Sequence, residues 1–190
     1  MKIFIGVAHT PDTPGKKCAG FVEYEWSKEI CERLKAQLEA FGFNAEIVYQ
    51  KTFYGPSQGL KQPVDDINRK ASKDDIAVFI HSNAMGTGAE TDHPANYFSV
   101  FTAESCSKKS TVLAEDYIWA VKQRLIGTRV LPVQKKNFYV IKNTKCPAIL
   151  TENGFYTNKK QREWLMSETG KQAIVDIHID CIVAFIQKGL

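Results

Sequence analysis

The chain has 190 residues, of which 44% are hydrophobic and 24% charged, and a formal net charge of +4. This composition is typical of a globular protein, and the length predicts a single domain over residues 1–190. No apolar run approaches the roughly 20 residues of a membrane span, and no basic and aromatic motif of a nucleic-acid module is present. We therefore expect neither membrane insertion nor a nucleic-acid partner, and the oligomeric state stays open.

Predicted strands and helices alternate along the chain. The first residues are apolar only as far as Ala8, which is too short for a secretory signal and favours a first strand. The predicted strands span residues 2–8, 44–49, 76–82, 97–102, 137–141 and 147–152. The predicted helices span residues 23–41, 62–71, 110–125, 158–167 and 169–187. This alternation predicts an α/β fold with a mostly parallel twisted sheet of about six strands, flanked by helices.

Three polar residues each follow a short apolar run that is typical of a buried strand. His9 follows residues 3–8, and His81 follows residues 76–80. Glu152 comes at the end of the last predicted strand. Ligands of open parallel sheets bind at the carboxyl ends of the strands. Two imidazoles and a carboxylate at that edge are the parts of a zinc site with an acid/base group beside it.

The predicted helix 23–41 indicates a third ligand. Glu23 shares one helical face with Ile30, Leu34 and Leu38, at steps of 7, 4 and 4 residues, and these apolar residues must face the sheet. Glu25 lies about 200 degrees around the helix and is expected to face solvent. Glu23 is therefore a candidate metal ligand, with a charge partner for the helix N-terminus as the alternative. Spacing alone leaves both open, because no local motif such as HExxH is present.

Taken together, these motifs resemble the zinc-dependent N-acetylmuramoyl-L-alanine amidases of bacterial cell-wall remodelling and of phage endolysins. The resemblance runs over nearly the whole chain. Its most specific motif is Pro-Ala-x-Leu-x-Glu-x-Gly-Phe-x-x-Asn, which residues 147–158 match. The family's His-x-Asn-Ala appears at residues 81–84, and its glycine shortly before a glutamate appears as Gly20 and Glu23.

The resemblance implies that His9, Glu23 and His81 hold Zn²⁺ and that Glu152 is catalytic. It also implies hydrolysis of the amide bond between the lactyl group of N-acetylmuramic acid and L-alanine, so the expected partner is peptidoglycan. One departure is Ala8, which stands where the family has a glycine before the histidine. Thr10-Pro11 likewise stands where the family has Gly-Gly, so we expect a stiffer turn after His9, not a loss of activity.

Other polar residues allow two interpretations each. Asn83 is a candidate to orient His81 or to bind substrate, and it is equally suited to cap the end of the strand. His93, in the loop 85–94, is expected to have no role, with substrate contact as the alternative. Cys18 is a weak candidate for a further ligand. His178 is expected to be a core histidine of the last helix.

Two other functions compete with an amidase. One is a non-catalytic peptidoglycan-binding module, which would need a broken ligand set. The other is a different zinc peptidase that acts within the stem peptide. Because we see no export signal, we expect synthesis in the cytoplasm and action on the cell wall after release or export. This favours a phage endolysin, with a cellular autolysin as the other possibility.

Overall fold

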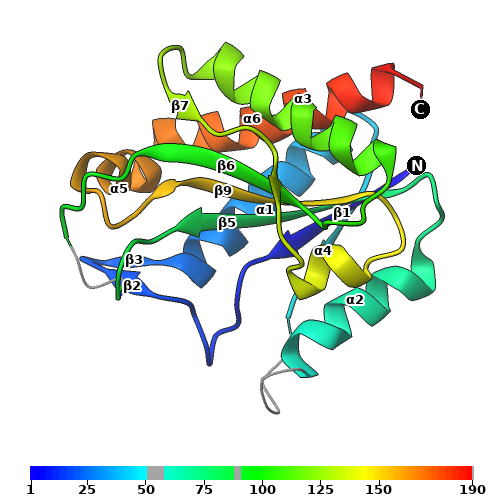
Figure 1. The fold of residues 1–190 in the computed structure, drawn as a ribbon, viewed down its shortest axis with the longest axis horizontal. Coiled ribbons are helices and arrows are strands. Elements are labelled where there is room, and N and C mark those ends of the chain that lie inside the picture. Colours follow the sequence, from blue (N-terminus) through cyan, green and yellow to red (C-terminus); the bar gives the residue numbers. More distant parts are fainter. Residues whose placement is uncertain (51–57, 88–90, 190) are drawn as a thin grey trace.

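The computed structural model describes residues 1–50, 58–87 and 91–189 (Figure 1). A twisted sheet runs through its centre in the order β4-β1-β5-β9-β6-β7, and β8 also pairs with β6. The strands are β1 (Lys2–Val7), β4 (Asn44–Val48), β5 (Ile76–Asn83), β6 (Tyr97–Thr102), β7 (Arg129–Val130), β8 (Gln134–Lys135) and β9 (Ala148–Phe155). Within the described ranges every pair of this sheet is parallel except β6 with β9. The prediction of a mostly parallel α/β sheet is confirmed.

The central strands are apolar on both faces because helices cover both faces. In β1, the side chains of Ile3, Phe4 and Ile5 are at most 1% exposed. Ile3 and Ile5 belong to the larger of two hydrophobic clusters, and Phe4 belongs to the smaller one on the opposite face. Near-continuous apolar runs are typical of strands in doubly covered parallel sheets.

The larger cluster packs three helices against the sheet: α1 (Glu23–Ala40), α3 (Lys108–Arg124) and α6 (Glu168–Gln187). The smaller cluster lies under α2 (Gln58–Lys70) and α4 (Tyr139–Asn143) on the other face. α5 (Lys159–Met166) follows β9 directly. A separate antiparallel pair, β2 (Lys17–Cys18) and β3 (Phe21–Val22), brings the chain from β1 to the start of α1 (Figure 1).

Three predicted elements differ from the structure. The predicted strand 147–152 continues as β9 to Phe155, so Glu152 lies within the strand and not at its end. The predicted strand 137–141 is wrong, because residues 139–143 form the helix α4, whose Val140 and Ile141 are buried in the smaller cluster. A short apolar run does not distinguish a buried strand from one turn of buried helix. α2 begins at Gln58, four residues before the predicted start at residue 62, and Leu60 of this added turn packs against the smaller cluster.

Among the described residues, the helices are all too short or too polar to cross a membrane. The carboxyl ends of β1, β5 and β9 meet at one edge of the sheet, because these three strands are parallel neighbours. The residues that follow or end these strands are therefore close together in space.

Candidate metal centre and active site

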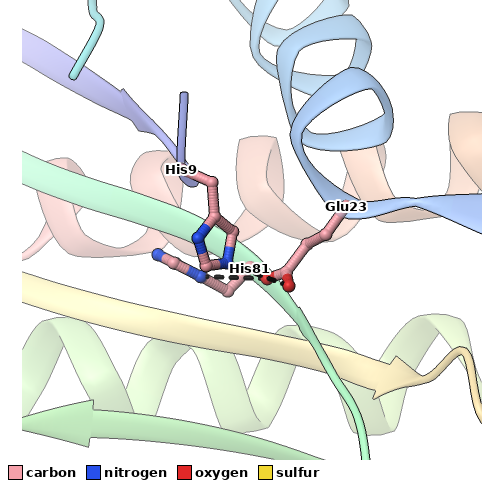
Figure 2. Close-up of side chains that lie close together, drawn as sticks. All are labelled: His9, Glu23 and His81. Atoms are coloured by element: carbon pink, nitrogen blue, oxygen red, sulfur yellow. Dashed lines mark hydrogen bonds and ion pairs between the residues drawn. The ribbon is translucent and has the colours of Figure 1, made fainter. Parts of the chain in front are cut away.

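Three side chains converge at this edge of the sheet, and all three come from the predicted set (Figure 2). His9 follows β1, Glu23 is the first residue of α1, and His81 lies near the end of β5. The Nε2 atom of His9 is 3.0 Å from Oε2 of Glu23, and Nδ1 of His81 is 3.0 Å from Oε1 of the same carboxylate. One potential ligand atom from each residue lies within 4.8 Å of the others. Ligand atoms this close together could hold one metal ion.

The turn between β1 and α1 is shaped to bring His9 against Glu23. His9 itself has φ of +64°, a left-handed conformation that is uncommon outside glycine. Gly15 has φ of +79°, and a Cβ atom there would lie 2.7 Å from the His9 ring and 2.8 Å from Oε2 of Glu23. Only glycine therefore fits at position 15, beside the candidate ligands. Sequence reasoning did not identify this residue.

The Ser27 hydroxyl connects the three elements that carry these residues. It accepts a hydrogen bond from the backbone N–H of Ala8 at 2.9 Å and donates one to the carbonyl of Ile80 at 2.6 Å. Ser27 lies on α1 and is fully buried. One side chain of α1 thus bonds the backbone just after β1 and within β5, in each case one residue before a histidine.

Glu23 is an ionised carboxylate in a buried position. Its side chain is only 6% exposed, and Glu25 is exposed, as the helical spacing predicted. Burial alone would raise the pKa of Glu23, but the hydrogen bonds from His81 and His9 outweigh it and lower the pKa to about 2. The hydroxyl of Tyr156 (3.4 Å) and the backbone N–H of Ser82 (3.4 Å) also donate to this carboxylate.

Glu152 lies beside the candidate centre on the neighbouring strand. It is the direct partner of His81 in the pairing of β5 with β9, so both side chains point to the same face of the sheet. Burial, and secondly the charge of Glu23, raise the pKa of Glu152 well above its ordinary value. Its Oε2 atom is buried, and no partner for it exists among the described residues.

The three candidate ligands and Glu152 share one cavity of about 440 Å³. His9, Glu23, His81 and Glu152 all line it. The remainder of its wall includes apolar side chains from the α2 and α4 side, namely Leu60, Phe138, Tyr139, Val140 and Leu150. A cavity with a polar end and an apolar wall can hold a substrate that has both kinds of group.

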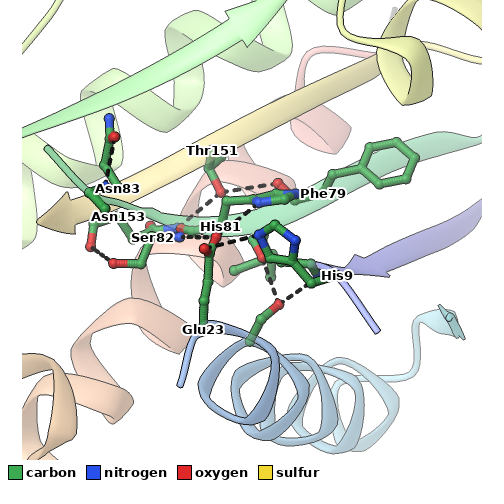
Figure 3. Close-up of polar contacts among 12 residues, drawn as sticks. His9, Glu23, Phe79, His81, Ser82, Asn83, Thr151 and Asn153 are labelled. Atoms are coloured by element: carbon green, nitrogen blue, oxygen red, sulfur yellow. Dashed lines mark hydrogen bonds and ion pairs between the residues drawn. The ribbon is translucent and has the colours of Figure 1, made fainter. Parts of the chain in front are cut away.

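Asn83 also lines the cavity, at the end of β5 (Figure 3). Its Oδ1 accepts a hydrogen bond from the backbone N–H of Ala84 at 2.9 Å. That bond is the turn contact expected of a residue that caps the strand end. Asn83 also lines the cavity, so its contact with substrate stays a prediction.

The remaining candidates lie outside the cluster of three. Cys18 is buried, receives a hydrogen bond from Arg162 and is not grouped with the candidate ligands. The Nδ1 atom of His93 accepts a hydrogen bond from the N–H of Ala95, and His93 does not line the cavity described above. The rest of the loop 85–94 includes residues 88–90, which lie outside the described residues. His178 is a buried core histidine of α6, as predicted.

Comparison with known proteins identifies the family. A model of the family described as N-acetylmuramoyl-L-alanine amidase matches residues 3–184. The N-acetylmuramoyl-L-alanine amidase LytC of Bacillus subtilis (strain 168) is 28% identical over 180 residues, which are 92% of this chain and 34% of LytC. The corresponding amidase CwlM of Bacillus licheniformis is 27% identical over 179 residues, covering 94% of this chain and 66% of CwlM. The chain thus spans about a third of LytC and about two thirds of CwlM.

Solved structures show the same fold. The N-acetylmuramoyl-L-alanine amidase AmiC2 of Nostoc punctiforme superposes with a TM-score of 0.82 at 23% identity, covering 98% of this chain and 97% of that one. An N-acetylmuramoyl-L-alanine amidase from Clostridium difficile 630 gives a TM-score of 0.82 at 18% identity, covering 98% and 96% of the two chains. With the family match over residues 3–184, we conclude that this chain belongs to the N-acetylmuramoyl-L-alanine amidase family.

Proposed function

We propose that this chain is a zinc-dependent amidase that hydrolyses the bond between the lactyl group of N-acetylmuramic acid and L-alanine in peptidoglycan. The observation that carries the proposal is the convergence of His9, Glu23 and His81, with Glu152 in the same cavity, in a member of this family. In this proposal residues 1–190 act as one catalytic domain. The chemistry is the same for an autolysin that remodels the wall and for a phage endolysin.

The donor set fits zinc. Zn²⁺ in catalytic sites takes three protein ligands, commonly imidazoles and a carboxylate, and keeps a further position open. His9, Glu23 and His81 are two imidazoles and one carboxylate. Glu23 already accepts a hydrogen bond from each ring, so an ion between them would replace those two shared protons. The hydroxyl of Tyr156 and the N–H of Ser82 would keep the carboxylate oriented toward the ion.

The chemistry divides between the ion and this chain's own residues. When bound, zinc supplies a Lewis acid for the scissile carbonyl and lowers the pKa of water toward about 7. Glu152 takes a proton from the attacking water, the oxygen of that water bonds to the carbonyl carbon, and the carbon–nitrogen bond breaks. Glu152 then returns the proton to the alanine nitrogen. The products are a lactyl carboxylate on the glycan and a stem peptide with a free L-alanine amine.

The two competing functions give different outcomes. A non-catalytic binding module calls for an incomplete set of these residues, whereas all four are present here. A stem-peptide peptidase would expose amines other than that of L-alanine.

The experiment is a digest of purified cell walls with the zinc-loaded chain, read by mass spectrometry. We expect stem peptides that begin with L-alanine and no new reducing sugar ends. Glu152→Gln should lower the rate by about 10²–10⁴-fold and keep one bound zinc ion, and His81→Ala should lose the ion. His93→Ala is the matched control, because it removes a histidine outside the cavity and should keep both zinc and activity. Near-normal activity of Glu152→Gln would overturn the assignment of its role.

A further inference from the structure

Asn153 is a fully buried polar side chain directly after Glu152, and the mechanism above does not use it. It lies where the pairing of β5 with β9 shifts register, between His81 and Asn83. Its Nδ2 donates to the backbone carbonyl of His81 at 2.8 Å (Figure 3). The same amide nitrogen donates to the hydroxyl of Thr151 at 3.1 Å. Asn153 thus holds the backbone of one candidate ligand from the strand that carries the candidate base.

The orientation of this amide is determined by its neighbours. The carbonyl of His81 can only accept, so the nitrogen must face it and the oxygen must face away. On that other side the hydroxyl of Tyr117, on α3, donates to Oδ1 of Asn153 at 2.8 Å. Tyr117 is itself fully buried. Both ends of the amide are therefore paired in one orientation, without access to solvent.

Thr151, which precedes Glu152, is also held by hydrogen bonds to buried groups. Nδ1 of His178 bonds to the carbonyl of Ile174 at 2.8 Å, so Nδ1 carries the proton and Nε2 accepts. The hydroxyl of Thr151 then donates to Nε2 of His178, 3.0 Å away. Thr151 and Asn153 are both buried and point away from the face that Glu152 occupies. Thr151 and Asn153 thus hold the Glu152 backbone through hydrogen bonds on the sheet face opposite the Glu152 side chain.

We propose that Asn153 is a positioning residue, which fixes the His81 backbone and the Glu152 backbone relative to each other. This proposal rests on the proposed function, in which His81 binds the ion and Glu152 moves the proton. Because both groups act on one substrate, a small shift between β5 and β9 at this point separates them. Sites of this kind tolerate displacements of only about 0.5 Å.

The test compares Asn153→Ala with Asn153→Leu. Leucine restores the lost volume but none of the hydrogen bonds, so a packing role predicts that Asn153→Leu regains normal properties. The positioning role predicts that it does not. For Asn153→Leu we expect about 10-fold weaker zinc binding, about 10-fold lower kcat, little change in KM and an altered absorption spectrum after cobalt substitution. Ser110→Ala is the matched control, because buried Ser110 bonds the N–H of Ala148 at the opposite end of β9.

Each result decides the proposal. Zinc affinity, cobalt spectrum and kcat of Asn153→Leu all within twofold of the original chain would overturn it. If Asn153→Leu does not fold, Tyr117→Phe takes its place, since it removes only the hydroxyl that pairs with Oδ1 of Asn153 and helps to hold the amide in place. A three- to tenfold loss of kcat with the thermal midpoint kept supports the proposal, and normal kinetics overturn it. Failure of the proposed function is distinguishable, because His81→Ala would then keep its zinc.

Discussion

Replacement of Gly15 by alanine is expected to damage the metal centre more than the fold. A Cβ atom at position 15 would lie 2.7 Å from the His9 ring and 2.8 Å from Oε2 of Glu23. Ordinary contacts begin at 3.4 Å, so these groups must move by about 0.7 Å, the difference between 3.4 and 2.7 Å. That exceeds the tolerance of about 0.5 Å for a preorganised site. We expect zinc binding to weaken by about 10- to 100-fold, as for losses of ligand orientation.

Gly42→Ala separates the two components of this effect. Gly42 has φ of +84°, close to the +79° of Gly15, but no atom lies within 4 Å of the added Cβ position. Both variants should therefore lose about 1 kcal/mol of unfolding free energy from the left-handed backbone. Only Gly15→Ala should lose zinc affinity.

The assay is competition with a chromophoric chelator for zinc, beside urea unfolding of the metal-free chains. The reasoning is refuted if Gly15→Ala binds zinc as tightly as the original chain does. It is also refuted if the two variants lose zinc affinity equally, because backbone strain alone would then account for the effect.

Three further predictions concern stability. Burial lowers the pKa of His178 from 6.5 to about 4, so between these pH values the unfolded chain binds a proton that the native chain does not. Unfolding free energy should thus fall by up to about 3 kcal/mol from pH 7 to pH 4, and His178→Gln, measured by urea unfolding, should lack this component. EDTA should lower the thermal midpoint of the zinc-loaded chain, because it removes the stabilisation by bound zinc, which is about 2.7 kcal/mol at a free zinc concentration 100 times the Kd. An unchanged midpoint would argue against native-state binding. Arg124→Ala breaks the exposed ion pairs with Asp176 and Asp180. It should lower the free energy of unfolding, measured by urea unfolding, by less than about 1 kcal/mol.

Sequence reasoning located the elements that bury a continuous apolar surface. The runs before His9, His81 and Glu152 are strands because residues such as Ile5, Ile80 and Leu150 are buried between two helix layers. The helical spacing of Glu23 with Ile30, Leu34 and Leu38 likewise predicted which face of α1 carries the carboxylate.

What sequence reasoning missed depends on long-range contacts. Gly15 matters because His9 and Glu23 close around it, which no pattern of residues 10–20 indicates. Asn153 bonds His81, 72 residues earlier in the chain, and Tyr117, 36 residues earlier. The wrong strand at 137–141 has the same origin, because the smaller cluster that buries Val140 and Ile141 is assembled from distant segments.

Mass spectrometry of peptidoglycan digested by the zinc-loaded chain is the most direct measurement of the central claim. The account predicts soluble stem peptides whose first residue is L-alanine with a free amine. It also predicts glycan strands whose lactyl groups carry free carboxylates. New amino termini elsewhere in the stem peptide, new reducing sugars, or an undigested wall would contradict it.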